Sequence, residues 1–425
     1  MERRLKKEVS LFHAVGIFIG VILGSGILIL PSIAANVAGA ASLIAWVIMT
    51  LLAVPIALTF GYLASKFPSA GGISEFSKQA FGKKTVGRIT LDAEMITGFL
   101  FLSVVPIGPP IVLLTGASYM GSIHGLDFSG IIALAILMLL AMLLINLRGI
   151  RFTGNFQTMM TISIVILLLF VVLTAFHLVN PDNLKFELDI YPIGRAMALI
   201  FWCYVGWEAV THLSEEFKNP ERDFPLSILM ALGVVGIMYL LVSFVVVGTH
   251  TYGDSLRGMT SLVEIANRSL GINGKLFVAL IGFMTCFGSA NVYVASPSRL
   301  LYALSRNGYL PEVFGVLNKK HAPQNALIAV AASMVFTLIA MYLFSISVET
   351  LLLLSNSIFI TLYLIGSIAG IILLEKRVYP AISFVICFAT LLFVGKSVVY
   401  PVLVAIIAIT YLNLYAKRKT SQFIR

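Results

Sequence analysis

The first apolar run of this chain has the tripeptide Gly24-Ser25-Gly26 at its centre, a pattern that can create an anion-binding site. No Asp, Glu, Lys or Arg occurs from position 9 to position 65, so the tripeptide must lie in lipid or in a protein core. Each glycine weakens a helix by about 1 kcal/mol relative to alanine. Gly24 and Gly26 lie about 200° apart on an ideal helix, so one packing face does not explain both. If the helix unwinds here, the free N–H groups of Ser25, Gly26 and Ile27 can point at an anion.

A second group of residues surrounds an isolated acid, Glu208. A carboxylate at the centre of a span costs about 2.5–3.5 kcal/mol on insertion scales, so it persists only when paired, protonated or facing water. Alternatively, Glu208 lies near the inner membrane surface with Glu215 and Glu216. Aromatic residues beside a flexible glycine favour a gate that closes over a ligand. The run that precedes the acid is Phe201-Trp202-Cys203-Tyr204-Val205-Gly206.

Membrane-spanning helices are needed to position these residues. The chain has 425 residues, of which 59% are hydrophobic and 11% are charged, whereas soluble domains carry about 25% charged residues. A span needs about 20 apolar residues. We predict twelve spans, at residues 11–38, 41–65, 91–120, 128–146, 156–178, 193–214, 225–249, 275–303, 325–346, 349–374, 379–395 and 398–416.

The two interruptions fall in corresponding spans of two halves, the first and the sixth. Broken helices at corresponding positions are typical of inverted-repeat transporters. With five spans in each half, the second half inserts upside down. We therefore predict an all-α polytopic membrane protein with a five-plus-five inverted repeat, in which one transmembrane domain covers residues 1–425, the first repeat 11–178, the second 193–374, and two additional helices 379–416.

The formal charge of +10 does not indicate a nucleic-acid partner. Lys and Arg gather in the segments that are cytoplasmic if the N-terminus is cytoplasmic, which follows the positive-inside rule and places both termini inside. The basic N-terminus precedes an apolar run too long for a signal peptide, so we interpret that run as the first span. Cys203, Cys286 and Cys387 lie within spans without metal or redox spacing, so we interpret them as small apolar fillers.

The segments between spans carry further expectations. Residues 67–90 are expected to lie on the inner membrane surface, and prolines in residues 217–225 should stop one helix and start another. Apolar spacing in residues 261–270 predicts a short amphipathic helix over the outer vestibule. Asp92 and Glu94, at the inner end of the third span, are expected to be solvated.

Polar and proline residues inside the spans have structural and functional interpretations. Pro106, Pro109 and Pro110 should kink the third span, because each lacks a backbone donor; this can also let Gly108 line a pocket. Interhelical hydrogen bonds are expected from Ser289, Asn291, Ser296 and Asn356. A cation site at Ser289 or its neighbours is an alternative interpretation.

Motifs of enzymes do not occur in this sequence. There is no phosphate loop, HExxH, G-x-S-x-G or cluster of Cys and His, and the six histidines are scattered. We therefore expect neither an enzyme nor a cofactor or metal. Main-chain groups freed at two breaks can satisfy one carboxylate and one ammonium, and the third span offers apolar side chains. This combination favours a zwitterionic, apolar substrate; the apolar residues are Val104, Val105, Ile107 and Ile111.

Motifs along nearly the whole chain match one family. They comprise Leu23-Gly24-Ser25-Gly26-Ile27 with Leu30-Pro31, Pro68-Ser69-Ala70-Gly71-Gly72, and residues 98–106, 201–209, 215–225, 298–303, 323–326 and 356–360. The chain resembles amino-acid permeases of the amino acid–polyamine–organocation superfamily, and most closely the bacterial L-methionine/branched-chain amino acid exporter group. The resemblance implies a secondary transporter of the bacterial inner membrane that works by alternating access.

The resemblance also implies roles for residues. The amides of Ser25, Gly26 and Ile27, beside Gly24, would hold the substrate carboxylate. The carbonyls of Ile22, Trp202 and Val205 would hold its ammonium. Trp202 or Phe201 would cap the site next to Gly206, and Glu208 would be the coupling or gating acid. Some relatives use a lysine in the fifth span instead of a cation, and this chain has none there.

The predicted function is export of Met, Leu, Ile and Val, driven by exchange with protons. Its partners are the amino acid, a coupling proton and the lipid bilayer. The sequence is compatible with a homodimer. The alternatives are a cationic amino acid or polyamine exchanger, for which Glu208 could serve as the pocket acid, a neutral amino-acid uptake permease, and a sensor that binds amino acid without moving it.

Overall fold

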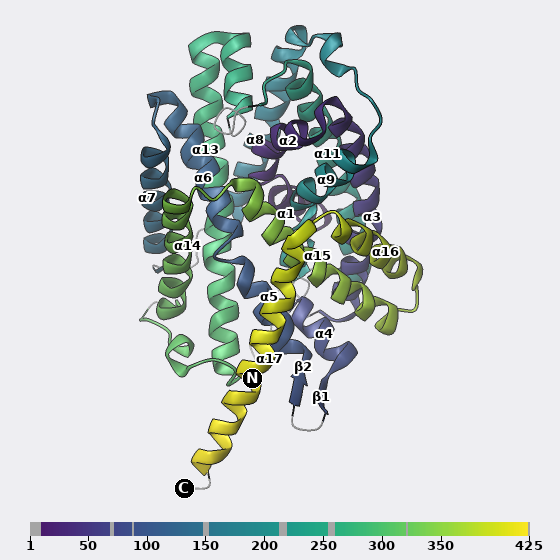
Figure 1. Ribbon diagram of the computed structural model, residues 1–425, viewed down its shortest axis with the longest axis vertical. Helices are drawn as coiled ribbons and strands as arrows, with labels where there is room; N and C mark the ends of the chain where they lie inside the picture. The colour runs from purple at the N-terminus through teal and green to yellow at the C-terminus, as the bar shows by residue number, and fades with distance from the viewer. Residues whose placement is uncertain are drawn as a thin grey trace.

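The computed structural model describes residues 10–68, 72–86, 89–147, 153–211, 219–253, 260–319 and 322–423. The chain forms a bundle of helices with a small hairpin beneath it (Figure 1). The helices of the first part are α1 (Leu11–Ile22), α2 (Gly26–Ala38), α3 (Ser42–Lys66), α4 (Ile73–Phe81), α5 (Ala93–Val104), α6 (Gly108–His124), α7 (Phe128–Leu147) and α8 (Thr153–Ala175). Those of the second part are α9 (Ile190–Ile200), α10 (Trp207–Thr211), α11 (Pro220–Gly248), α13 (Ser261–Arg306), α14 (Gln324–Phe344), α15 (Val348–Leu373), α16 (Val378–Leu392) and α17 (Val399–Phe423).

Within the described ranges, nine helical stretches are long and apolar enough to cross a membrane. Eight of them coincide with one predicted span each, and the ninth, Gly26–Lys66, covers the second half of the predicted first span together with the predicted second span. In their described residues, the predicted spans 11–38, 193–214 and 379–395 consist of helices shorter than 18 residues, and breaks divide the first two of them. The chain is therefore a helical, multi-pass protein. Its one departure from the all-α prediction, among the residues placed by the structure, is the antiparallel hairpin of β1 (Lys83–Val86) and β2 (Ile89–Asp92).

The third predicted span is also interrupted, where we expected only a kink. Its two helices, α5 and α6, are separated by residues 105–107. Pro109 and Pro110 have no N–H group, so they cannot donate to the carbonyls of Val105 and Pro106 one turn earlier. Residues 105–107 instead form a turn with hydrogen bonds between residues three positions apart, such as that from the Ile107 N–H to the Val104 carbonyl at 2.9 Å.

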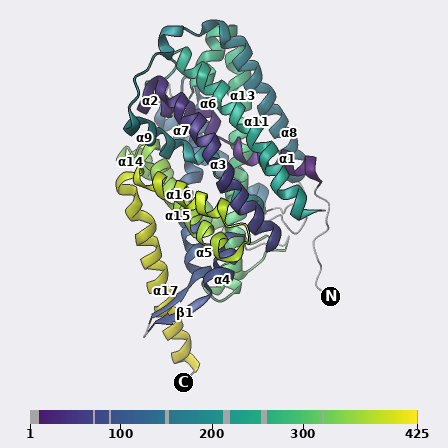
Figure 2. The same ribbon diagram turned by 90° about the vertical axis from the view of Figure 1, so that its right-hand side faces the viewer.

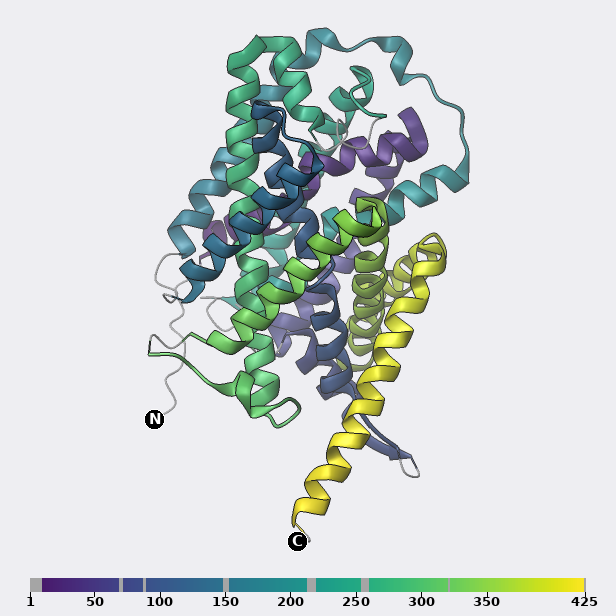
Figure 3. The same cartoon turned by 60° about the vertical axis from the view of Figure 1, so that its left-hand side comes forward.

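The long helix α13 packs along α6 (Figures 1 and 3). The Asn146 side-chain amide of α7 donates to the Asn291 oxygen of α13 at 2.7 Å, which confirms the interhelical role predicted for Asn291. On the other side, α1 and α3 pack against α11 (Figure 2). The prediction that a proline starts the seventh span is confirmed, because α11 begins at Pro220; residues 212–218 lie outside the described part of the chain.

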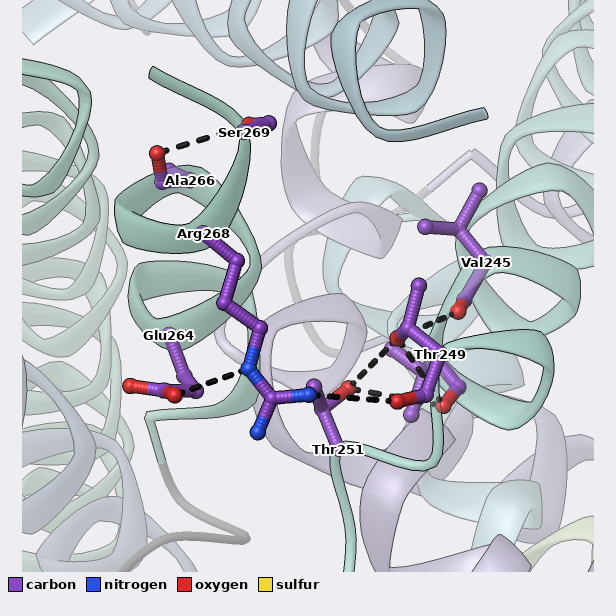
Figure 4. Close-up of polar contacts among 8 residues, drawn as sticks. Val245, Thr249, Thr251, Glu264, Ala266, Arg268 and Ser269 are labelled. Carbon is purple, nitrogen blue, oxygen red and sulfur yellow. Dashed lines mark hydrogen bonds and ion pairs between the residues drawn. The ribbon is translucent and has the colours of Figure 1, made fainter. Parts of the chain in front are cut away.

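The amphipathic helix predicted at residues 261–270 is confirmed. It forms the first part of α13 and ends at Gly271, whose φ of 66° separates it from the long helix. Leu262, Ile265 and Ala266 are buried. The Arg268 guanidinium donates to the Glu264 carboxylate of the same segment at 2.9 Å. It also donates to the Thr249 carbonyl at the end of α11, at 3.3 Å (Figure 4). The segment is thus fixed over the end of α11.

The opposite end of the bundle corrects one expectation. Asp92, predicted to be solvated, is only 4% exposed. It caps α5 by accepting the Met95 N–H at 3.3 Å, and it accepts the Tyr309 hydroxyl at 3.0 Å. Burial and the bond to Asp92 raise the pKa of Tyr309, so this hydroxyl remains a donor at neutral pH. Glu94, also predicted to be solvated, is partly buried and pairs with Lys78 at 3.2 Å.

The segment predicted to lie on the inner membrane surface is packed against the bundle over part of its length. Helix α4 buries Ile73 and Phe76 and contacts α5 and α15. Residues 69–71 and 87–88 of this segment are outside the described residues.

Replacing Asp92 by alanine is expected to lower the free energy of unfolding by about 2–4 kcal/mol. The change removes a helix cap, worth about 1 kcal/mol, and a hydrogen bond to a charged group, worth about 1.5–3 kcal/mol. Thermal unfolding of the purified chain, followed by tryptophan fluorescence, measures the loss. Asp127→Ala removes the exposed cap of α7, with its bond to the Gly130 N–H, and should cost less. Equal effects of the two changes would mean that the Tyr309 bond contributes nothing.

Candidate functional site

The first break lies between α1 and α2, at Leu23, Gly24 and Ser25. The first N–H groups of any helix lack partners within that helix. Leu28 N–H turns back to the Ser25 carbonyl at 3.1 Å. In the part of the chain that the structure describes, no acceptor is found for the amides of Gly24, Ser25 and Ile27. Ser25 is 2% exposed, so these donors lie in the protein interior.

The second break lies between α9 and α10. A short 3₁₀ turn, Phe201–Tyr204, follows α9, and the chain then extends through Val205 to Gly206. Gly206 has a φ of 126°, a conformation that side chains disfavour, so glycine is required at this point. The Asn356 side-chain amide of α15 donates to the carbonyls of Ala198 and Leu199 at 2.8 and 3.1 Å, and it thereby holds the freed end of α9. This confirms the interhelical bonding predicted for Asn356.

One hydroxyl joins the two breaks. The Tyr239 oxygen of α11 lies 2.6 Å from the Ile22 carbonyl, at the end of α1, and 2.9 Å from the Cys203 carbonyl in the 3₁₀ turn. A hydroxyl has a single proton, so it satisfies one of these carbonyls at a time. An ammonium has three protons and matches such a carbonyl pair better.

The two breaks converge on one cavity. Residues of both breaks, of α6 and of α13 line it: Ile22, Gly24, Ser25, Gly26, Val112, Trp202, Val205, Ser289 and Tyr293. The space admits about one water molecule. Close packing favours glycine at both Gly26 and Gly108. A Cβ at Gly26 would lie 2.8 Å from the Cys203 sulfur, and a Cβ at Gly108 would lie 2.7 Å from the Trp202 ring.

Glu208 lies directly behind the second break and is 2% exposed. Its carboxylate accepts the Tyr363 hydroxyl of α15 at 2.5 Å and the Gly206 N–H at 3.0 Å. The Gly206 N–H also lies 3.3 Å from the Tyr363 oxygen. A change in the charge of Glu208 therefore acts on the main chain of the break through Gly206.

Six of the nine residues predicted to bind substrate line this one cavity, and three lie behind it. Phe201 is fully buried, with its ring 5.7 Å from that of Tyr363, whereas Trp202 faces the cavity and packs against Phe359 at 5.8 Å. Of the two predicted caps, Trp202 is thus the one at the cavity. Ile27 is also fully buried, and the Gly206 N–H donates to the Glu208 carboxylate.

The sequence analysis missed Val112, Tyr239, Tyr293 and Tyr363. Val112 takes the place in the cavity that we expected Val104, Val105, Ile107 or Ile111 to fill. Tyrosines in apolar spans are a recognisable signal, because a buried hydroxyl needs a partner. The sequence did not indicate which partner each one has.

A second hollow lies on the other side of the first break, between α1, α8 and α13. Its lining residues are Gly20, Leu23, Gly24, Thr161, Ile164, Thr285, Gly288 and Ser289. Ser289 and Gly24 border both hollows. Among the described residues, no cluster of His, Cys, Asp or Glu could hold a metal ion.

Comparison with known proteins gives the same class of protein. The amino acid permease family model matches residues 9–422. The chain is 33% identical to the L-methionine/branched-chain amino acid exporter YjeH of Escherichia coli (strain K12), over 98% of both chains. It is 35% identical to the uncharacterized amino acid permease YecA of Bacillus subtilis (strain 168), over 96% of both.

A more distant relative is the branched-chain amino acid permease BcaP of Bacillus subtilis (strain 168), which is 26% identical over 98% of this chain and 94% of its own. The family match covers nearly every residue, including both breaks and the cavity between them. The chain belongs to the amino acid permease family.

Proposed function

We propose that this chain is a secondary transporter that exports L-methionine and the branched-chain amino acids Leu, Ile and Val by alternating access, in exchange for protons. One observation carries the proposal: residues of both breaks line one cavity, and amides of the first break have no acceptor among the described residues. The amides of Ser25, Gly26 and Ile27 bind the substrate carboxylate. The carbonyls of Ile22, Trp202 and Val205 bind its ammonium.

The rest of the cavity favours a neutral, apolar side chain. Val112 and Trp202 supply apolar surface, and no charged side chain lines the cavity in the described part of the chain. Because the space admits about one water molecule, the half-helices must separate to admit methionine. The names of the relatives YjeH and BcaP support methionine and branched-chain substrates, and that of YjeH supports export.

Glu208 is the coupling acid in this proposal. It is buried, its carboxylate accepts a hydrogen bond from the main chain of the second break, and it has no basic partner among the described residues. Proton uptake weakens its hold on the Gly206 N–H and frees the break to move. The chain lies in the bacterial inner membrane as twelve spans, ten of them in the inverted repeat, with both termini cytoplasmic.

Flux measurements in proteoliposomes test the function. The full chain is reconstituted, and uptake of labelled methionine, leucine and arginine is measured under imposed proton or sodium gradients. We expect methionine and leucine to exchange with each other. We also expect both to accumulate in liposomes whose lumen is more acidic than the outside, because protons then leave as the amino acid enters. Competition by arginine but not by methionine would indicate a cationic exchanger. Binding without flux would indicate a sensor. A sodium requirement would indicate a cation site in the hollow beside Ser289.

Direction is tested in cells. Overproduction of the chain should lower intracellular methionine and raise resistance to toxic methionine analogues. Increased sensitivity would instead show an uptake permease.

Tyr239→Phe is expected to reduce transport about tenfold and to destabilise the ligand-free protein. The change removes the one proton that the buried carbonyls of Ile22 and Cys203 share, at about 1–3 kcal/mol. The ammonium of bound methionine can donate to the Ile22 carbonyl in its place. Saturating methionine should therefore raise the melting temperature more in this variant than in the unaltered protein.

Tyr119→Phe is the matched control. The Tyr119 hydroxyl is also buried and donates to a main-chain carbonyl, that of Leu28 at 3.0 Å, but it does not line the cavity. This variant should lose stability without any gain in the response to methionine. The same response in both variants would show that Tyr239 is only a structural donor.

A further inference from the structure

We propose that the β1–β2 hairpin and the adjoining part of α17 form a binding surface for the anionic headgroups of one membrane leaflet. The hairpin projects below the helix bundle and lies beside α17 in two views (Figures 1 and 3). This surface is separate from the substrate cavity, and the proposal rests only on the chain being a membrane protein.

The hairpin is fixed to α17 by its main chain. The Asn413 side chain of α17 accepts the Thr90 N–H at 2.8 Å and donates to the Thr90 carbonyl at 3.1 Å. It therefore occupies the outer edge of β2 as a neighbouring strand would. The Phe99 and Tyr411 rings pack at 5.6 Å nearby. The hairpin thus has a defined depth relative to α17.

That depth is the level at which α17 leaves the apolar layer. Ile406, Ile407 and Leu414 are between 54% and 61% exposed, as expected for side chains that face lipid. Asn413 lies at the end of this apolar stretch, and the first charged residue of α17, Lys417, follows one turn later. The strands attached at Asn413 therefore lie among the headgroups.

One face of the hairpin has the chemistry of a membrane surface. Side chains alternate along a strand, so Ile89 and Leu91 share one face, away from buried Asp92. They are 52% and 36% exposed, and Lys84 is paired with Leu91 across the strands and is exposed too. Exposed apolar residues beside lysine favour the boundary between acyl chains and headgroups.

The charges around this face favour anionic lipid over zwitterionic lipid. Lys84 belongs to this face, whereas Lys83 lies on the opposite face with its cross-strand partner Asp92. The Lys83 side chain is 60% exposed, and the Asp92 carboxylate, at 3.7 Å, is turned inward. The α17 range 399–423 contains no Asp or Glu. Basic groups at the membrane surface attract anionic headgroups, and two exposed lysines with no exposed acid nearby meet that condition.

Hydrogen exchange of the full chain in nanodiscs tests the proposal. Discs contain either phosphatidylcholine alone or phosphatidylcholine with one third phosphatidylglycerol. We expect the amides of residues 83–92 to exchange about fivefold or more slowly in the anionic discs. Lys83→Gln combined with Lys84→Gln should reduce this difference, and 1 M salt should abolish it.

Lys185→Gln combined with Lys396→Gln removes the same charge from exposed positions elsewhere and should leave the difference unchanged. Ile89→Ser combined with Leu91→Ser should reduce protection in both kinds of disc. Equal exchange of residues 83–92 in the two lipids would overturn the proposal. Protection that depends on the number of chains per disc, and not on the lipid, would assign the face to a second copy of this chain and would also overturn it.

Discussion

Replacement of Gly26 by valine is expected to abolish methionine binding and transport while the protein still folds and inserts. The new Cβ would lie 2.8 Å from the Cys203 sulfur and 3.4 Å from the Trp202 ring, both fully packed in the second break. Overpacking of this kind costs about 1–3 kcal/mol of folding stability, less than the roughly 5–15 kcal/mol by which native proteins are stable, so the variant should still fold. The added γ-carbons of valine also cover the amides that face the carboxylate. Isothermal titration with methionine and flux in proteoliposomes measure the loss.

Gly16→Val is the matched control for this substitution. Gly16 lies in α1, on the same predicted span, but a Cβ at this position meets nothing within 4 Å. We expect this variant to bind and transport normally. If Gly26→Val also transports normally, the first break is not the substrate site. If both variants fail, the cause is the β-branched residue in a helix and not the cavity.

The overall architecture could be predicted because lipid imposes a strong pattern on the sequence. Uncharged runs of about 20 residues marked the spans, and Gly24-Ser25-Gly26 marked a break that the structure places between α1 and α2. The break in the third span was predicted only as a kink. Prolines remove donors in either case, so the sequence alone does not distinguish a kink from a break.

The side-chain partners of the site could not be predicted, because they come from distant segments. Tyr239 meets Ile22 across 217 positions, and Tyr363 meets Glu208 across 155. Neither contact leaves a local spacing pattern. Asp92 shows the same difficulty at the membrane surface: an acid before a helix predicts a cap, but its burial depends on Tyr309, which is 217 positions away.

Glu208→Gln is expected to abolish accumulation of methionine driven by a proton gradient and to preserve methionine–methionine exchange. Glutamine retains an oxygen that can accept the Tyr363 hydroxyl and the Gly206 N–H, so the break keeps its geometry. Glutamine does not take up a proton, so the step that couples the gradient to the break is lost. Uphill accumulation should fall to the level of empty liposomes. Exchange should persist, since both hydrogen bonds are retained with a neutral acceptor.

Tyr363→Phe separates coupling from geometry at the same site. It removes one partner of Glu208 and leaves the acid able to titrate, so accumulation should persist with a displaced pH dependence. Tyr363 also packs its ring on Phe201 and Phe60, contacts that phenylalanine retains. If Glu208→Gln still accumulates methionine against a proton gradient, Glu208 is a structural acid. The proton-coupling group must then be another titratable residue.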